Sequence, residues 1–313
     1  RSPGFLSCVT ALEFGVRADA AEVYVPRAAA AARDEDAAEP QSESVYVPSA
    51  PENAAPVLSA PDKAATLTIN NDTDYDVDVA ACLASDTHIR AEGDEHFSAD
   101  GDGPQVLIYH THSSESYTPD AAFPYTPTET ERTTDTRYNV VRVGDELCTA
   151  LEKRGIETLH IRSLFDTPTY AGSYDRSLAA VEQALEENPS VKVVIDLHRD
   201  SILTDEGEAY KTSCTVDGAE TAQLMFVVGT DAGGLYHPDW RDNLNFVSTL
   251  QYALNRAYPS LMRPVNLRTQ RFDQHASPGS LLVEVGSSGN TLPEALSAVR
   301  LFADVLADEM TGM

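Results

Sequence analysis

The 313-residue chain contains 50 acidic and 22 basic residues, which gives a formal net charge of -28. This balance argues against a nucleic-acid-binding function, because contacts to phosphate backbones need clustered Lys and Arg. The sequence also has no apolar run of the roughly 18 residues that a membrane-spanning helix requires.

The first part of the chain differs in composition from the rest. Residues 1–65 are rich in Ala, Pro, Ser and acidic residues and show no sustained period of a helix or strand. Such a segment buries too little apolar surface to offset the entropy lost on ordering, so we expect a disordered acidic linker. Because the sequence begins at Arg1 rather than Met, we also expect an upstream membrane anchor or signal to have been removed.

Residues 66–103 are expected to form a small β accessory segment. The alternating residues 65–69 precede a turn signal at Asn70-Asn71-Asp72, and residues 75–80 alternate again, which predicts a hairpin. The four cysteines are widely spaced and include no Cys-x-x-Cys pair, so they predict neither a zinc ribbon nor a disulfide scaffold. They are Cys8, Cys82, Cys148 and Cys214.

From residue 104 to 313 the sequence predicts one catalytic domain in which strands and helices alternate. Strands are expected at 106–109, 156–161, 191–197, 224–229 and 281–285, and helices at 139–154, 173–188, 239–258 and from 291 onward. Ser173 is the expected cap of its helix, and Thr291-Leu-Pro-Glu294 has the spacing of a capping box. This order predicts an α/β fold with a mostly parallel sheet covered by helices on both faces.

Metal-binding residue types follow several of these strands. His112 and Glu115 come after the first strand, His198 follows a second, and Glu284 ends a third. Ligand sites of open α/β sheets lie outside the carboxyl ends of the strands, so these four side chains are expected to meet. Two imidazoles and one carboxylate suit catalytic zinc, which keeps a fourth position open for water.

Glu115 and Glu284 are expected to have different roles in the reaction. His112, Glu115 and His198 would bind Zn²⁺, and Glu284 would take a proton from the attacking water and pass it to the leaving amine. His110 is a second candidate for the first ligand, because it shares one side of an extended segment with His112. The His-x-x-Glu spacing favours His112.

Further residues are candidates for a supporting role or for contact with the substrate. Arg199 could bind a carboxylate or an oxyanion, or form a salt bridge with a neighbouring aspartate. Arg271 and Gln274 precede the strand of Glu284 and either line the cleft or belong to a polar loop. The supporting candidates are His110, Asp196, Arg271 and Gln274.

Three motifs together resemble the stage II sporulation protein P family, over about residues 66–313. The motifs are His110-Thr-His-Ser-Ser-Glu-Ser-Tyr117, Asp196-Leu-His-Arg-Asp-Ser201, and Ser277-Pro-Gly-Ser-Leu-Leu-Val-Glu-Val-Gly286 followed by Asn290-Thr291. Members of this family are similar to zinc-dependent N-acetylmuramoyl-L-alanine amidases with an α/β sandwich fold.

The resemblance matches His112, His198 and Glu284 to conserved positions of those amidases. Their middle Glu ligand opens the first helix, where this chain has Asp135-Thr-Arg-Tyr-Asn139 and no Glu. The His112-x-x-Glu115 spacing is closer to that of zinc carboxypeptidases, so we assign Glu115 as the carboxylate ligand of the zinc ion.

The resemblance also implies a setting. It suggests an extracytoplasmic, membrane-tethered enzyme that cleaves peptidoglycan during engulfment, between the mother-cell and forespore membranes. It implies as partners sporulation protein D, a lytic transglycosylase, and the membrane protein M. A zinc peptidase acting on wall peptides and an inactive wall-binding scaffold stay open as alternatives.

Overall fold

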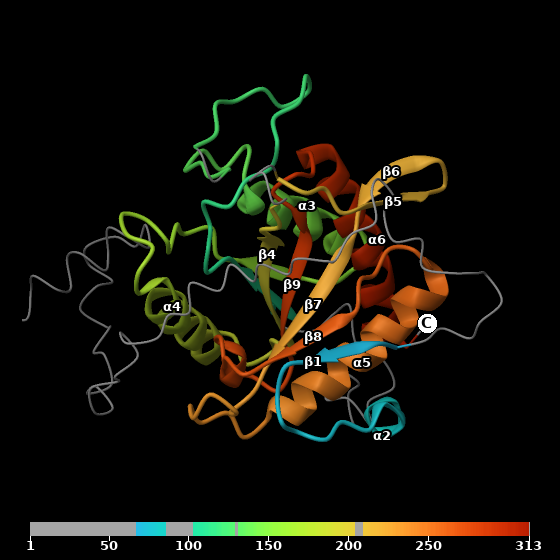
Figure 1. Ribbon diagram of the computed structural model, residues 1–313. Helices are drawn as coiled ribbons and strands as arrows, with labels where there is room; N and C mark the ends of the chain where they lie inside the picture. Colours follow the sequence, from blue (N-terminus) through green and yellow to red (C-terminus); the bar gives the residue numbers. More distant parts are fainter. Residues whose placement is uncertain (1–66, 86–102, 129–130, 204–208, 313) are drawn as a thin grey trace, which may run out of the picture.

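The computed structural model describes residues 67–85, 103–128, 131–203 and 209–312 (Figure 1). In chain order they form β1 (Ile69–Asn71), α2 (Val79–Ala84), β2 (Val106–Tyr109), α3 (Val140–Lys153), β3 (Thr158–His160), α4 (Ser173–Glu187), β4 (Val193–Asp200), β5 (Ser213–Val216), β6 (Ala219–Ala222), β7 (Leu224–Gly229), α5 (Trp240–Ala257), β8 (Val265–Arg268), the 3-10 turn η2 (Gln274–Ala276), β9 (Ser280–Ser287) and α6 (Leu292–Thr311). The linker expected at residues 1–65, with Cys8, lies outside the described residues.

Seven strands form one sheet in the order β1-β8-β7-β9-β4-β2-β3, and β5 and β6 form a separate two-stranded sheet. Every pairing in the larger sheet is parallel except that of β7 with β9. The strands β2, β4 and β9 therefore run side by side in one direction, and their carboxyl ends meet at the same edge. The expected mostly parallel sheet is confirmed.

Helices cover both faces of this sheet, as the sequence predicts. The larger core joins α3, α5 and α6 to residues such as Ile108 and Val283, whereas a smaller core joins α4 to Leu107 and Val194. Alternate residues of one strand thus face different helices, and β2 is buried at every position. In Figure 1 α4 lies on the left, apart from α3, α5 and α6.

The helix ends follow local sequence signals with one exception. Asn139 accepts a hydrogen bond from Val141 at the start of α3, and the predicted capping box of Thr291 and Glu294 opens α6. The prediction that Ser173 caps α4 is wrong, because Gly172 occupies that position with φ +75° and Ser173 is the first helical residue. This shift brings Ser173 Oγ to 3.4 Å from His112 Nδ1.

The expected hairpin near the amino end is not formed. β1 instead pairs in parallel with β8 at the edge of the main sheet, and Asn71 holds the following turn by accepting from Thr73. Tyr75 then stacks on Trp240 of α5 with 5.0 Å between ring centroids. Packing against the large core therefore replaces strand pairing, and this segment becomes part of the main fold.

Gly286 adds an extra residue to β9 just after Glu284. His198 of β4 is opposite Glu284, but Asp200 is opposite Ser287, so β9 gains one residue over β4 at this point. Gly286 has φ +68°, and a Cβ there would lie 2.7 Å from Asn290 Oδ1. Such bulges redirect the chain near functional sites, and here the bulge ends the regular pairing beside Glu284.

We expect Gly279→Ala to lower the free energy of unfolding by about 3 kcal/mol or more, at the upper end of overpacking costs. A Cβ at this position would lie 2.0 Å from the carbonyl oxygen of Lys192, and neither backbone can move without disturbing β4 and β9. Urea denaturation measures the change. Gly218→Ala is the comparison, since its Cβ would meet nothing within 4 Å and only its positive φ costs about 1–2 kcal/mol. Equal losses would contradict the steric argument.

Candidate metal and catalytic site

The segment after β2 is a rigid turn that carries His112 and Glu115. The Glu115 amide donates to the carbonyl oxygen of His112 at 3.1 Å, which brings the two residues onto one turn. Thr111 donates to both carboxylate oxygens of Asp196, from its amide at 2.9 Å and its hydroxyl at 2.8 Å. Ser113 Oγ donates to the carbonyl oxygen of His110 at 2.8 Å. Each polar residue of this motif therefore helps to fix the turn.

His198 lies within its strand rather than beyond it, and Glu284 lies within β9 as expected. The expected strand end at residue 197 is too early, because pairing with the long strand β9 carries β4 on to Asp200. His198 and Glu284 are directly opposite each other on neighbouring parallel strands, which are about 4.8 Å apart. Their side chains therefore project from the same face of the sheet.

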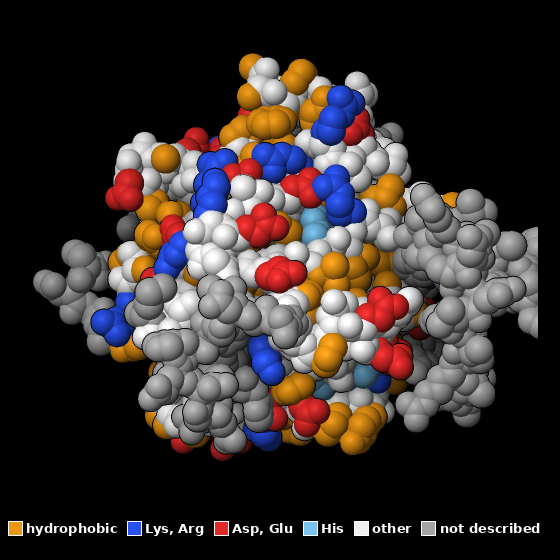
Figure 2. Space-filling model, turned by 180° about the vertical axis from the view of Figure 1, so that it is seen from behind, with side chains coloured by type: hydrophobic (Ala, Val, Ile, Leu, Met, Phe, Trp, Pro, Cys, Tyr) orange, Lys and Arg blue, Asp and Glu red, His pale blue; other side chains and the backbone are white. Residues whose placement is uncertain are grey.

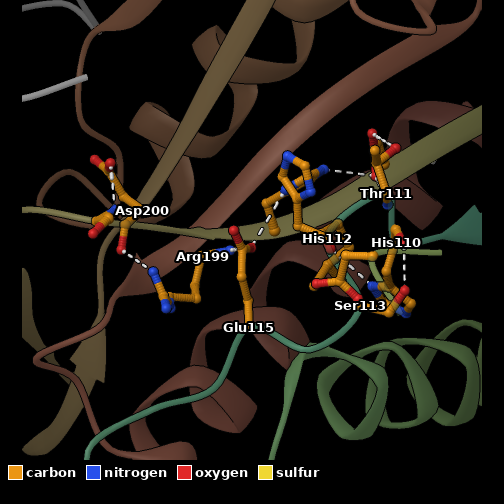
Figure 3. Close-up of polar contacts among 12 residues, drawn as sticks. His110, Thr111, His112, Ser113, Glu115, Arg199 and Asp200 are labelled. Carbon is orange, nitrogen blue, oxygen red and sulfur yellow. Dashed lines mark hydrogen bonds and ion pairs between the residues drawn. The ribbon is translucent and has the colours of Figure 1, made fainter. Parts of the chain in front are cut away.

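The structure brings His112, Glu115 and His198 together at this face. Glu115 Oε2 lies 3.4 Å from His198 Nδ1, and the rings of His112 and His198 are perpendicular with 5.2 Å between centroids. Glu115 also accepts a hydrogen bond from the Arg199 amide at 3.1 Å, as Figure 3 shows. All three side chains are buried.

Burial and charge set different protonation states for these groups. Burial lowers the pKa of His112 to about 3, so its ring is neutral at neutral pH. Burial acts in the same direction on His198, but Asp196 and Glu115 outweigh it and raise the pKa of His198 well above its ordinary value. Burial would raise the pKa of Glu115, yet hydrogen bonding to His198 and the charges of His198 and Arg199 lower it. The two neighbouring carboxyl groups, Asp196 and Glu115, thus favour the protonated form of His198.

The carboxyl group of Glu284 differs from that of Glu115 in its pKa. Burial, followed by the charge of Asp200, raises the pKa of Glu284 to about 8, despite the opposing charge of His198. Its buried Oε2 has no hydrogen-bond partner among the described residues. A buried oxygen left in this way is costly unless it has another use. The site thus combines a carboxylate of low proton affinity, Glu115, with a carboxylate of high proton affinity, Glu284.

The donor set suits zinc in its chemistry and in part of its geometry. Two ligands bound tetrahedrally at 2.0–2.1 Å stand about 3.3 Å apart, close to the 3.4 Å between His198 Nδ1 and Glu115 Oε2. As the side chains lie, however, no three His, Cys, Asp or Glu residues of the described ranges converge as a ready-made metal site. Asp196 Oδ1 lies 2.8 Å from His198 Nε2, an ion-pair contact rather than an aligned hydrogen bond.

His110 takes part in a different cluster. Its Nδ1 contacts the carbonyl oxygen of Leu197 at 2.8 Å and its Nε2 contacts His160 Nε2 at 2.8 Å. His160 in turn lies 3.2 Å from Asp145. A Cβ on Gly144 would be 2.7 Å from both the His110 and His160 rings, so α3 packs tightly on the pair. Both ring nitrogens of His110 are therefore engaged away from Glu115.

Two candidates for substrate contact have other partners. The Arg199 guanidinium donates to the backbone carbonyls of Ser116, Glu131 and Asp200. The amide group of Gln274 accepts a hydrogen bond from the Gly229 amide and donates one to the Val227 carbonyl, both at the end of β7.

Arg271 donates to the carbonyl oxygen of Tyr236 at 3.2 Å and so contacts the loop after β7. This contact agrees with the polar-loop alternative for Arg271.

Two residues at the site were missed by the sequence analysis. The Tyr170 hydroxyl hydrogen bonds with His112 Nε2 at 2.8 Å, and its ring stacks on that imidazole. Arg132 lies 3.5 Å from Glu115 Oε1 and 3.1 Å from Asp166 Oδ2. Both come from loops without periodicity, so no sequence signal marks them.

On the face drawn in Figure 2, Lys and Arg are interspersed with acidic side chains rather than clustered.

The burial of His237 predicts that the stability of the fold depends on pH. It is fully buried, and neither ring nitrogen has a partner among the described residues. Burial, with Arg271 adding to it, lowers the pKa of His237 to about 4, whereas the unfolded chain binds the proton near 6.5. Below pH 6.5 the unfolded state therefore binds more protons, and stability is lost as the pH falls toward 4.

We expect His237→Leu to reduce this pH dependence, because the unfolded chain then no longer gains that proton. Thermal denaturation of both proteins between pH 4.5 and 7.5 measures it. Parallel curves for wild type and variant would contradict the assignment.

No helix in the described part of the chain is long and apolar enough to span a membrane.

Among solved structures, the amidase AmiC2 of Nostoc punctiforme is similar over 67% of this chain and 97% of its own, with 13% identity and a TM-score of 0.37. An N-acetylmuramoyl-L-alanine amidase from Clostridium difficile 630 matches 66% of this chain and 94% of its own, with 13% identity and a TM-score of 0.36.

The sequence comparisons are more specific. Stage II sporulation protein P of Bacillus subtilis (strain 168) is 31% identical over 229 residues, which are 70% of this chain and 54% of the relative. The chain thus spans about half the length of that relative. The family model of stage II sporulation protein P matches residues 22–307 and confirms the resemblance seen in the three motifs. This chain belongs to the stage II sporulation protein P family.

Proposed function

We propose that this chain is a zinc-dependent peptidoglycan hydrolase that cleaves the amide between N-acetylmuramic acid and L-alanine. One observation carries the proposal: His112, Glu115 and His198 meet on the sheet face from which Glu284 also projects. Two imidazoles and a carboxylate form a catalytic zinc set, and a separate carboxyl group beside them is the base that hydrolysis requires.

His112, Glu115 and His198 would hold the zinc ion, which when bound supplies Lewis-acid activation of water and of the scissile carbonyl. His112 is neutral at neutral pH, the state in which an imidazole binds metal. His198 must lose its proton, and Asp196, 2.8 Å from its Nε2, fixes the ring while it does so. Metal binding is therefore expected to release protons.

Glu284 moves the proton in this reaction. It takes a proton from the attacking water, and the remaining hydroxyl bonds to the carbonyl carbon of the muramic lactyl group. The carbon–nitrogen bond then breaks, and Glu284 gives its proton to the nitrogen of L-alanine. Glu284 acts as the base in its ionised form, and the pKa of about 8 that burial gives it makes this carboxylate a stronger proton acceptor than an ordinary one while its acid form can still return the proton.

Family membership supports a setting in sporulation. We place the activity outside the cytoplasm, on the peptidoglycan between the mother-cell and forespore membranes during engulfment. Tethering through an anchor upstream of Arg1, and partnership with sporulation protein D and the membrane protein M, are parts of this proposal that rest on the resemblance of the three motifs.

The test is mass spectrometry of the fragments that the full 313-residue chain releases from purified peptidoglycan, with zinc and after removal of metal by a chelator. Free stem peptides that begin with L-alanine, present only with zinc, are the expected result. Split cross-links without these peptides would instead identify a zinc peptidase, the alternative favoured by the His112-x-x-Glu115 spacing. Binding to the wall without any release would indicate a scaffold.

A further inference from the structure

The two imidazoles of the site have similar surroundings. The Nε2 atom of His198 lies 2.8 Å from Asp196 Oδ1, and its Nδ1 atom faces Glu115 Oε2 at 3.4 Å. The ion pair at Nε2 leaves Nδ1 as the nitrogen that faces Glu115, and carboxylates or other acceptors behind metal-binding histidines commonly fix the ring orientation.

His112 is also held through Nε2, but by a tyrosine. The Tyr170 hydroxyl is 2.8 Å from His112 Nε2, and the two rings stack with 4.4 Å between centroids and 16° between planes. The Nδ1 atom of His112 has a much looser contact, to Ser173 Oγ at 3.4 Å, which is longer than an ordinary hydrogen bond. Nδ1 is thus the nitrogen of His112 with the weaker protein contact.

Tyr170 is held in place although its side chain is 43% exposed. Arg176 of α4 donates to the carbonyl of Thr169 at 2.6 Å and to that of Ala171 at 3.1 Å, so the backbone is fixed on both sides of Tyr170. The guanidinium of Arg132, which also contacts Glu115, lies 5.1 Å from the centre of the Tyr170 ring. These contacts describe a fixed support for His112 rather than a mobile cover.

We propose that Tyr170 is a positioning residue for the first metal ligand: its phenol oxygen accepts the Nε2–H of His112 and thereby leaves the Nδ1 lone pair as the ligand atom. Tyr170 would do for His112 what Asp196 does for His198. This inference rests on the zinc site of the proposed function and adds to it a residue that acts through His112.

The experiment measures zinc affinity of the full chain by competition with a chromogenic chelator, which requires no enzymatic activity. Tyr170→Phe keeps the stacked ring and removes only the hydroxyl. We expect zinc binding about 10–100-fold weaker, as for loss of other groups that orient metal ligands. Tyr252→Phe on α5 is the matched control, because α5 packs on the opposite face of the sheet, and it should bind zinc like the wild type.

Affinity of Tyr170→Phe equal to or higher than that of the wild type would overturn the inference, since the hydroxyl would then be neutral or compete with the metal. Failure of the wild type itself to bind zinc would overturn the proposed function along with it. Long-range ¹H–¹⁵N NMR of the zinc-loaded wild type gives a second readout. A proton on His112 Nε2 is expected, and a proton on Nδ1 would show that the assignment is reversed.

Discussion

Glu284→Gln is expected to lower the rate of peptide release from peptidoglycan by about 10²–10⁴-fold, the usual contribution of a general acid–base. Glutamine has nearly the same shape but can neither accept the proton of the attacking water nor return it to the leaving nitrogen. Zinc affinity should change little, because Glu115 rather than Glu284 makes the close contact with His198. Chromatography of released stem peptides over time measures the rate.

The fold of this variant should be intact. A neutral amide replaces a carboxyl whose pKa burial already raises to about 8 and whose buried Oε2 has no partner among the described residues, so thermal stability at neutral pH should not fall. Glu152→Gln makes the same chemical change at an exposed position of α3, on the opposite face of the sheet, and should leave the rate unchanged. A Glu284→Gln protein that retains wild-type turnover would rule out Glu284 as the base.

His112→Gln is expected to weaken zinc binding by more than about 100-fold, beyond the 10–100-fold cost of losing a group behind a ligand. The ring of His112 stands perpendicular to that of His198 with 5.2 Å between centroids, so His112 brings the second imidazole to the proposed zinc site. Glutamine keeps a polar side chain there but lacks the imidazole nitrogen. Competition with a chromogenic chelator measures the affinity.

His110→Gln is the matched variant, two residues away, and should behave in the opposite manner. Zinc affinity should stay close to that of the wild type, because both ring nitrogens of His110 contact Leu197 and His160 instead. The free energy of unfolding should fall by about 1–3 kcal/mol, the cost of leaving a buried polar partner unsatisfied. Loss of zinc binding in His110→Gln but not in His112→Gln would reverse the assignment.

Local signals in the sequence were enough for most of the fold. The unbroken apolar run of β2 predicts a strand buried on both faces, and the capping box of Thr291 and Glu294 sets the start of α6. These features depend on neighbours a few residues apart, so the sequence displays them directly. The hairpin expected near Asn71 failed because its alternating pattern is equally satisfied by an edge strand beside β8, nearly two hundred residues along the chain.

The candidate site, like the fold, was predictable from the sequence only in part. The sequence by itself determined the donor types and their order, because His112, Glu115, His198 and Glu284 follow or end apolar strands whose carboxyl ends share one edge. Only the tertiary structure separated His110 from His112, since a turn, and not an extended segment, follows β2 and sends the two rings to different partners. It also assigned Arg199 and Gln274 to backbone carbonyls and amides and brought Tyr170 onto His112. These contacts join residues distant in sequence, and their geometry is set by packing across the sheet, which no local pattern encodes.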